Sequence, residues 1–546
     1  MAELMIGGHI IARQLKAEGV SCIFTLCGGH VAPIYDGCLR EGIDIVDTRH
    51  EQAAVHAADG WARLTRQCGV AVITAGPGVT DGVTGVANAY QASIPLVVFG
   101  GAAELRFKGK GALQEMEQTS LLAPITKASF TASDPKRLAE YVRTAFRIAT
   151  SGVPGPVFIE VPFDVLTQQV TDPLFPAAPR PWPRQPGDPA AIAAAAALID
   201  QAKQPMIFAG SQVYWDDAAD ELRALAERAG IPVFLNAMGR GALPSEHPLS
   251  LSHARKNGFR GTDLAIVVGT PLDFRVGYGA GINKDATIIQ LDRDPTKIAQ
   301  NRDAAVAILG DAKSMLGQLA AAVADGGGRT AGWIEELRTA ERAQDAKLAK
   351  WATSDAQPIN HYRLGKAIAD AIDEDTIVIG DGGDCVALAA KVIPRGKMGT
   401  WMDPGPLGCL GIGAPFAIAA KKLRPGAKVL VLSGDGSFGL NGFDFETCVR
   451  FGLHVCVVVG NDAAWGQIRG PQVMIFGAAR SPATKLAPTR YDRVVEAFGG
   501  KGYHVEDPAE LTATIKRALA EPTVTCINVP IDPDFVVKSG AAKLTV

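Results

Sequence analysis

Residues 429–468 read VLVLSGDGSFGLNGFDFETCVRFGLHVCVVVGNDAAWGQI and contain two apolar runs that each end in polar residues. The first run ends in Gly434-Asp435-Gly436, and the second ends in Asn461-Asp462. Runs that are apolar throughout are typical of parallel strands covered on both faces. We expect a helix beginning near Asn441 to connect them, so that both strands end at the same edge of the sheet.

Acidic and glycine residues at that edge predict a site for a cation and a phosphate. Glycines let the backbone approach a phosphate, and the following helix presents free amides to it. Asp435 would repel a phosphate unless a hard cation lies between them. Asp462 should reach the same edge, and carboxylate and phosphate oxygens suit Mg²⁺. A lone Gly-Asp-Gly triplet also fits a simple turn that ends a strand.

The whole chain alternates β-rich runs with helical stretches. At 546 residues it exceeds the size of a single core. Proline-rich residues 173–189 and the glycine-rich stretch near residue 326 divide it into three α/β segments. We predict domains at residues 1–170, 190–330 and 355–535.

The polar pattern resembles the diphosphate motif of thiamine-diphosphate (ThDP) enzymes. The resemblance implies an α/β fold with three doubly wound parallel-sheet domains in the pyruvate oxidase/decarboxylase-like architecture. It implies that Mg²⁺ is bound by Asp435, Asp462 and Ala464, although most of the family has asparagine where this chain has Asp462. The cofactor-binding residues that it implies are Gly382, Asp384, Gly408, Leu410, Gly434, Asp435, Gly436, Ser437, Asp462 and Trp465.

The earlier triplet Gly380-Asp381-Gly382 could be a decoy or part of the same site. Gly408 follows Asp381 at the same spacing in the sequence as Asp462 follows Asp435, so a second cation ligand would be needed there, and glycine has no side chain to bind a cation. The triplet is similar to the family's other diphosphate-contacting loop, which implies a partner to the main site. Leu410 stands where the family has a bulky residue that props the cofactor, and ordinary core packing fits it equally.

Candidate catalytic residues lie in the first segment. The stretch Arg49-His50-Glu51 resembles the family's glutamate motif, which implies that Glu51 activates the cofactor's pyrimidine ring, with a pKa raised by burial. His30 follows two glycines at a strand end, and Gln114 is expected at the start of a helical stretch. Both resemble proton-steering groups of the family. Trp465 could form a wall of the substrate pocket, although structural roles fit His30 and Trp465 about as well.

Across nearly the whole chain the resemblance is to acetolactate-synthase-like proteins, including 2-hydroxyacyl-CoA lyases. It implies a lyase or carboligase; alternatives are an acetolactate synthase acting on pyruvate, a benzaldehyde-lyase-like enzyme and a non-catalytic ThDP-binding paralogue. Residues 252–264 replace the stretch that contacts flavin in acetolactate synthases, which puts FAD in doubt. Arg255, Lys256 and Arg260 could bind coenzyme A phosphates in the central domain, or form a solvated basic surface.

Composition sets the expected partners and location. The net charge is −3, and no apolar run approaches the length of a membrane span, so neither nucleic acid nor a membrane is expected as a partner. The N-terminus lacks the features of a signal peptide, which favours a cytoplasmic protein acting on a small molecule. The resemblance implies a homodimer or a dimer of dimers, in which Glu51 of one subunit faces the diphosphate site of another.

Overall fold

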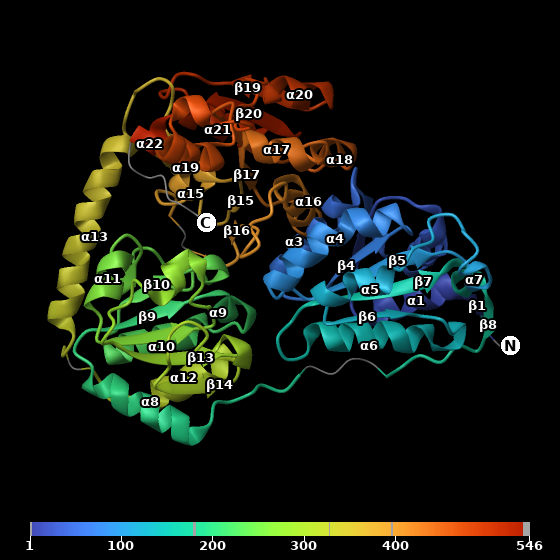
Figure 1. Cartoon of the computed structure of the whole chain (residues 1–546), viewed down its shortest axis with the longest axis horizontal. Coiled ribbons are helices and arrows are strands. Elements are labelled where there is room, and N and C mark those ends of the chain that lie inside the picture. Colours follow the sequence, from blue (N-terminus) through green and yellow to red (C-terminus); the bar gives the residue numbers. More distant parts are fainter. Residues whose placement is uncertain (1–2, 178–181, 327, 395–396, 539–546) are drawn as a thin grey trace.

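A computed structural model describes residues 3–177, 182–326, 328–394 and 397–538. Part of the predicted linker, residues 178–181, lies outside them. The described chain contains three six-stranded parallel sheets, one in each lobe of Figure 1, and a small antiparallel pair, β1 (Leu4–Ile6) with β8 (Gln169–Thr171). The predicted fold class is therefore confirmed. No described helix is long and apolar enough to cross a bilayer.

The four inner strands of the N-terminal sheet are almost entirely buried, as the unbroken apolar runs predicted, and its two edge strands are partly exposed. Its strand order is β3 (Asp44–Asp47), β2 (Cys22–Thr25), β4 (Gly69–Ile73), β5 (Leu96–Ala102), β7 (Pro156–Pro162) and β6 (Ala128–Thr131). Helices cover both faces of the sheet; they include α1 (Gly7–Ala17), α2 (Ala32–Glu41), α3 (Glu51–Thr65), α4 (Pro77–Gln91) and α6 (Leu138–Thr150).

The C-terminal sheet repeats this strand order, and the central sheet, which is also parallel and six-stranded, has a different order. The central order is β11 (Ser250–Leu251), β10 (Val233–Leu235), β9 (Pro205–Ala209), β12 (Leu264–Val268), β13 (Thr287–Asp292) and β14 (Val306–Leu309). The C-terminal order is β16 (Trp401–Met402), β15 (Ile377–Asp381), β17 (Val429–Gly434), β18 (Cys456–Asn461), β20 (Thr525–Pro530) and β19 (Lys501–His504). In each domain two neighbouring strands send their connections to opposite sides, and ligands bind at such switch points.

One expected boundary is wrong. The helix after β17 begins at Asp435 and not near Asn441, because α17 (Asp435–Asn441) starts directly at the end of the strand; α18 (Asp444–Arg450) follows it. Gly434 has extended dihedral angles and serves as the N-cap residue, so Asp435 occupies the first turn of the helix. A carboxylate is favourable there because of the helix dipole.

The N- and C-terminal domains pack through α3 and α16 (Gly413–Leu423). Phe416 is fully buried, and a Cβ on Gly60 would lie only 3.0 Å from its ring, so this small residue permits the close approach of the two helices. Arg63 is buried at the same interface and donates to Asp59 at 2.6 Å and to the carbonyl of Asp403 at 2.9 Å.

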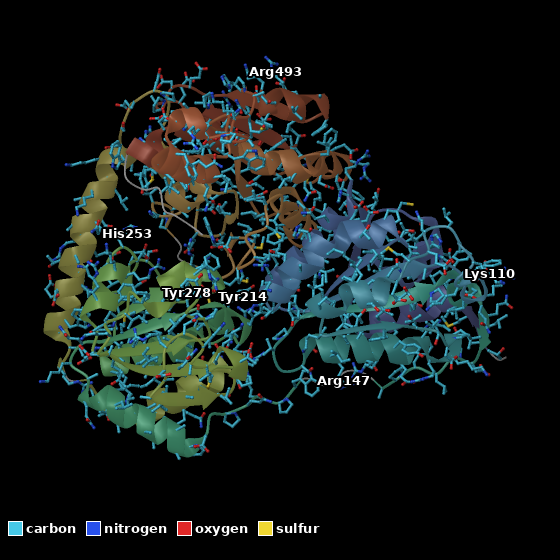
Figure 2. The ribbon with its side chains drawn as sticks, viewed as in Figure 1. Lys110, Arg147, Tyr214, His253, Tyr278 and Arg493 are labelled. Atoms are coloured by element: carbon cyan, nitrogen blue, oxygen red, sulfur yellow. The ribbon has the colours of Figure 1, made fainter. Side chains whose placement is uncertain are left out.

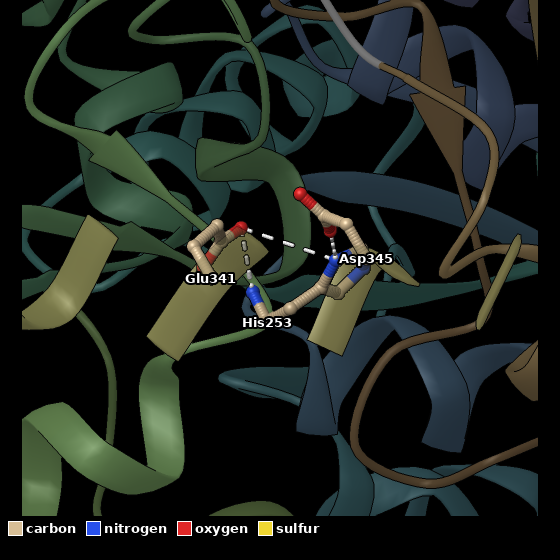
Figure 3. A group of neighbouring side chains, drawn as sticks. All are labelled: His253, Glu341 and Asp345. Atoms are coloured by element: carbon tan, nitrogen blue, oxygen red, sulfur yellow. Dashed lines mark hydrogen bonds and ion pairs between the residues drawn. The ribbon is translucent and has the colours of Figure 1, made fainter. Parts of the chain in front are cut away.

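The long helix α13 (Ala331–Ala352) ties the central domain to the C-terminal domain (Figure 1). Figure 3 shows His253 between Glu341 and Asp345 of this helix, with Nδ1 2.5 Å from Asp345. The other ring nitrogen contacts the carbonyl of Lys391 at 2.8 Å, and Glu341 accepts from the amides of residues 252–254. These bonds use both ring nitrogens and both Glu341 oxygens, so the cluster serves as a structural tie.

Candidate active site

The structure brings Asp435 and Asp462 together at the carboxyl ends of β17 and β18, next to the switch point between β15 and β17. Their carboxyl groups hydrogen-bond each other. The amide of Ala464 lies 3.2 Å from an oxygen of each. Burial is the main cause that raises the pKa of both carboxyls, and the charge of Asp435 raises that of Asp462 further. Two buried acids in contact need a proton or a cation between them, so this pair fits Mg²⁺.

Ala464 offers a further oxygen ligand. It forms an isolated bridge with Lys485, but the bonds on either side belong to Ala463 and Trp465. Within the described residues, no backbone amide donates to the Ala464 carbonyl. The donor set expected for the cation, namely two carboxylates and this carbonyl, is therefore compatible with the local geometry.

Glycines form the cradle in front of the carboxyl pair. A Cβ on Gly382 would lie 3.0 Å from the amide nitrogen of Gly434, and one on Gly436 would lie 2.5 Å from the ring of Trp465. The triplet at residues 380–382 therefore lies beside the main motif, as expected of a partner loop. Gly408 has a φ of +69° and no described atom within 4 Å of its Cβ position, so it faces open space.

The remaining predicted cofactor residues surround this cradle. Asp384 is the first residue of α15 (Asp384–Ala389), and its carboxyl faces the same small residue, Gly466, as Asp462. Burial raises the pKa of Asp384 to about 6. Ser437 hydrogen-bonds Asp381, whose carboxylate also accepts from the amides of Gly411 and Gly413 at 2.9 and 2.8 Å. Asp381 thereby fixes the segment that contains Leu410, which is half-buried.

Glu51 lies at the corresponding edge of the N-terminal sheet. It is the first residue of α3, only 6% exposed, and burial raises the pKa of its carboxyl. A Cβ on Gly78 would lie 3.2 Å from Oε1 of Glu51 and 2.7 Å from Cγ2 of Thr74. Glu51 and Thr74 therefore approach the same glycine.

His30 and Gln114 belong to the same neighbourhood. Nδ1 of His30 lies 3.5 Å from the hydroxyl of Thr74. Burial lowers the pKa of His30, and a hydrogen bond with Gln114 opposes the shift. Thr74 thus links residues that the sequence suggested separately, and it directly follows Ile73, the last residue of β4. The expectation that Gln114 starts a helix is wrong: it lies in a loop with φ +60°, and α5 is Gln118–Leu122.

The Glu51 group and the Asp435 pair belong to different domains of the chain. Among the described residues, no hydrogen bond or ion pair joins them. The domains are connected instead through pairs such as Arg450 with Asp47 at 2.7 Å and Lys422 with Asp44 at 2.7 Å.

A cleft lies where the three domains meet, at the switch point between β9 and β12. Its polar lining includes Gln212, Arg275, Asp292 and Lys297, and its apolar lining includes Met238 and Trp215. Gln212 donates to Asp292 at 2.6 Å. Tyr214, labelled in Figure 2, donates to the carbonyl of Arg63, and Arg63 lines the cleft. The position and mixed lining are typical of a nucleotide-binding cleft.

The predicted basic cluster does not line this cleft. It lies on α11 (Arg255–Gly261), where Lys256 and Arg260 are exposed and Arg255 is partly buried. Arg255 lies close to Arg240, a residue that the sequence did not single out. Burial lowers the pKa of both guanidinium groups, and the charge of Arg240 lowers that of Arg255 further. Within the described residues, neither arginine forms an ion pair or a hydrogen bond.

Family models match most of this architecture. The model "Thiamine pyrophosphate enzyme, N-terminal TPP binding domain" matches residues 5–121, the "central domain" of the same family matches residues 192–319, and the "C-terminal TPP binding domain" matches residues 381–529. The matched segments contain both carboxylate groups described above.

Relatives align along nearly the whole chain. The acetolactate synthase large subunit IlvG of Mycobacterium tuberculosis is 40% identical over 97% of each chain. 2-Hydroxyacyl-CoA lyase 2 of Danio rerio is 38% identical over 94% of this chain and 89% of the relative. The human 2-hydroxyacyl-CoA lyase 2 is 36% identical over 92% of this chain and 85% of the relative.

Proposed function

Because this chain belongs to the thiamine pyrophosphate enzymes, which make or break C–C bonds, we propose that it is a ThDP- and Mg²⁺-dependent lyase of the 2-hydroxyacyl-CoA type. It would convert a 2-hydroxyacyl-CoA to an aldehyde or ketone and formyl-CoA, and catalyse the reverse condensation. When bound, ThDP supplies a thiazolium carbon that adds to a carbonyl and accepts the charge left by C–C cleavage.

The chain's own residues have distinct tasks in this proposal. Asp435, Asp462 and the Ala464 carbonyl hold Mg²⁺, and the glycine cradle admits the diphosphate. Glu51 holds a proton opposite the pyrimidine ring, which its raised pKa supports. His30, whose lowered pKa keeps it neutral at pH 7, exchanges a proton with the substrate oxygen, with Gln114 as its hydrogen-bonding neighbour.

The observation that favours a coenzyme A thioester is the pair Arg240 and Arg255. Arg240 and Arg255 lie close enough for their charges to repel, although the Asp403 carboxylate and the Trp401 ring partly offset the charge of Arg240, so an anion beside the pair would be stabilised. Arg240 follows Met238 of the three-domain cleft by two residues. We infer that the cleft accepts the adenine nucleotide of coenzyme A and that the two arginines bind its phosphates. Lys256 and Arg260 stay candidates for weaker, solvent-screened contacts with the same phosphates.

The second candidate is an acetolactate synthase acting on pyruvate, which the relatives from mycobacteria favour. The same cleft would then accept the adenine end of FAD. Absorbance of the purified protein near 450 nm, the region of flavin absorption, separates these occupants.

We propose that the active unit is a homodimer or a dimer of dimers with sites between subunits. Among the described residues no hydrogen bond or ion pair joins the Glu51 group to the Asp435 pair, which supports a site that a second copy completes. Large apolar side chains are exposed beside both groups, as expected of an interface. They are Leu105, Phe107, Leu113 and Met116 in the N-terminal domain, and Ile468, Met474, Ile475 and Phe476 in the C-terminal domain.

One substrate panel tests the function. The protein with ThDP and Mg²⁺ receives a 2-hydroxyacyl-CoA, its pantetheine thioester, pyruvate or benzoin, and products are identified by mass. We expect formyl-CoA from the first substrate. Arg255→Met should raise KM for the CoA thioester and leave that for the pantetheine thioester unchanged. Acetolactate from pyruvate without turnover of either thioester would favour the second candidate. The expected cytoplasmic location stays a prediction for cell fractionation.

A further inference from the structure

We propose that Gln118 is a positioning residue that holds His30 and Gln114 in register for proton transfer. This inference rests on the function proposed for those two residues. Gln118 is only 1% exposed and begins α5, four residues after Gln114. Its side chain is buried beside the pocket that Gln114 also lines, and it makes three hydrogen bonds with parts of the chain that are distant in sequence.

The first bond fixes the backbone behind Gln114. Oε1 of Gln118 accepts from the amide of Gly76 at 2.8 Å. Gly76 has φ +60° and ψ −110°, a conformation that favours glycine. A Cβ on Gly76 would lie 2.8 Å from the carbonyl oxygen of Gln114, so the two backbones are in direct contact. Displacement of Gly76 would therefore shift Gln114.

The second bond fixes the backbone behind His30. Nε2 of Gln118 donates to the carbonyl of Gly101 at 3.0 Å. A Cβ on Gly101 would lie 2.6 Å from Cβ of His30. One side chain thus secures the two glycines against which the two candidate proton-transfer residues pack.

The third bond anchors Gln118 itself. Nε2 also donates to Glu160 on β7 at 2.8 Å, and the hydroxyl of Thr131 donates to the other oxygen of Glu160 at 2.9 Å. Glu160 is 9% exposed, so removal of either partner leaves a buried polar group unsatisfied. Strands β5, β6 and β7 therefore set the position of Gln118.

The loop in front of Gln118 has its own organising contact. Glu115 accepts from the amides of Gly111 and Ala112 at 3.1 and 3.0 Å, and from that of Gly109. The loop is therefore a preformed unit, and Gln118 supplies its attachment to the sheet. Loss of this attachment should move the unit as a whole, and a shift of about 1 Å at a reacting group can cost on the order of 100-fold in rate.

Gln118→Met tests the proposal because it keeps the size and removes all three bonds. We expect kcat to fall on the order of 10- to 100-fold, with ThDP affinity unchanged, and amide hydrogen exchange at residues 109–117 to accelerate. Gln14→Met is the matched control, because Gln14 is also 1% exposed but lies on α1, and its one side-chain hydrogen bond among the described residues is to Glu18. The swap Gln118→Glu with Glu160→Gln should restore only part of kcat, because it re-forms the bonds to residue 160 and to the Gly76 amide but leaves the Gly101 carbonyl without its donor.

Two results would overturn the inference: kcat of Gln118→Met equal to that of Gln14→Met at matched folded fraction, or unchanged hydrogen exchange in residues 109–117. Failure of the proposed function gives a different pattern. If His30→Ala and Gln114→Ala both leave turnover intact, those residues have no proton-transfer role, while the exchange measurement still reports whether Gln118 holds the loop.

Discussion

Replacement of Gly436 by alanine should weaken binding of the cofactor, because Gly436 lies against Trp465. The new methyl carbon would lie 2.5 Å from Cζ3 of the indole ring, whereas carbon atoms pack at 3.5–4.0 Å. The ring therefore has to move by about 1 Å. Trp465 directly follows Ala464, whose amide contacts both carboxyls of the cation pair. Displacement of the ring should disturb the cation ligands.

The expected size follows from the cost of overpacking, which is about 1–3 kcal/mol. In the cofactor-free protein, the segment around Trp465 can relax to make room for the methyl group. Cofactor binding requires the original position of this segment, so the overpacking energy weakens binding. Affinity for ThDP at saturating Mg²⁺ should fall about 5- to 150-fold, because 1.4 kcal/mol corresponds to a factor of ten.

Titration calorimetry measures this loss, with Gly439→Ala as the matched control. Gly439 lies on the same helix, and a Cβ there would meet no described atom within 4 Å. That control should retain wild-type affinity and gain about 0.5–1 kcal/mol of stability from helix propensity. Equal affinities in the two variants would refute the proposed proximity of Gly436, Trp465 and the cation ligands.

Three further predictions concern the same site. Burial raises the folded-state pKa of Asp462 to about 8, so the cofactor-free protein should lose stability as pH rises from about 4 to 8. Mg²⁺ should therefore raise Tm more at pH 8 than at pH 5.5. Equal increases in Tm at the two pH values would count against a cation at this pair. Asp462→Asn should flatten the pH dependence of Tm in thermal scans. If this variant binds Mg²⁺-ThDP and the native protein does not, the extra carboxylate prevents binding. Glu51→Gln and Asp435→Asn should each abolish turnover. If each site spans two subunits, refolding an equal mixture of the two variants should restore activity to about a quarter of wild type. No recovery in assembled hybrids would place both residues in a site of one chain.

The fold was predictable because its main signal is local. Strands such as β17 and β18 are apolar throughout and end in glycine or polar residues. This pattern can be recognised in the sequence without any knowledge of packing. The boundary at Asp435 was missed because a glycine-rich triplet also fits a loop. Only the dihedral angles of Gly434 and the helical turn after it show that the strand passes directly into α17.

The candidate site was predictable where a residue carries a charge at a strand end, as with Asp435 and Glu51. Gln114 was misplaced because the apolar spacing around it fits a helix, whereas Glu115 binds the amides of Gly111 and Ala112 and forms a loop. Arg240 and Gln118 gave no usable signal. Their importance comes from partners that folding brings together from other segments, and no spacing in one sequence encodes such contacts.

The most direct test of the account is exchange of the thiazolium C2 proton of bound ThDP, followed by NMR after dilution into D₂O and acid quenching. We expect fast exchange on the wild-type protein with Mg²⁺. Glu51→Gln should bind the cofactor but exchange this proton about 10²- to 10⁴-fold more slowly, as expected when a proton-transfer partner is lost. Equal exchange rates on the two proteins, with equal occupancy of the cofactor, would contradict the assignment of Glu51 as the activating acid.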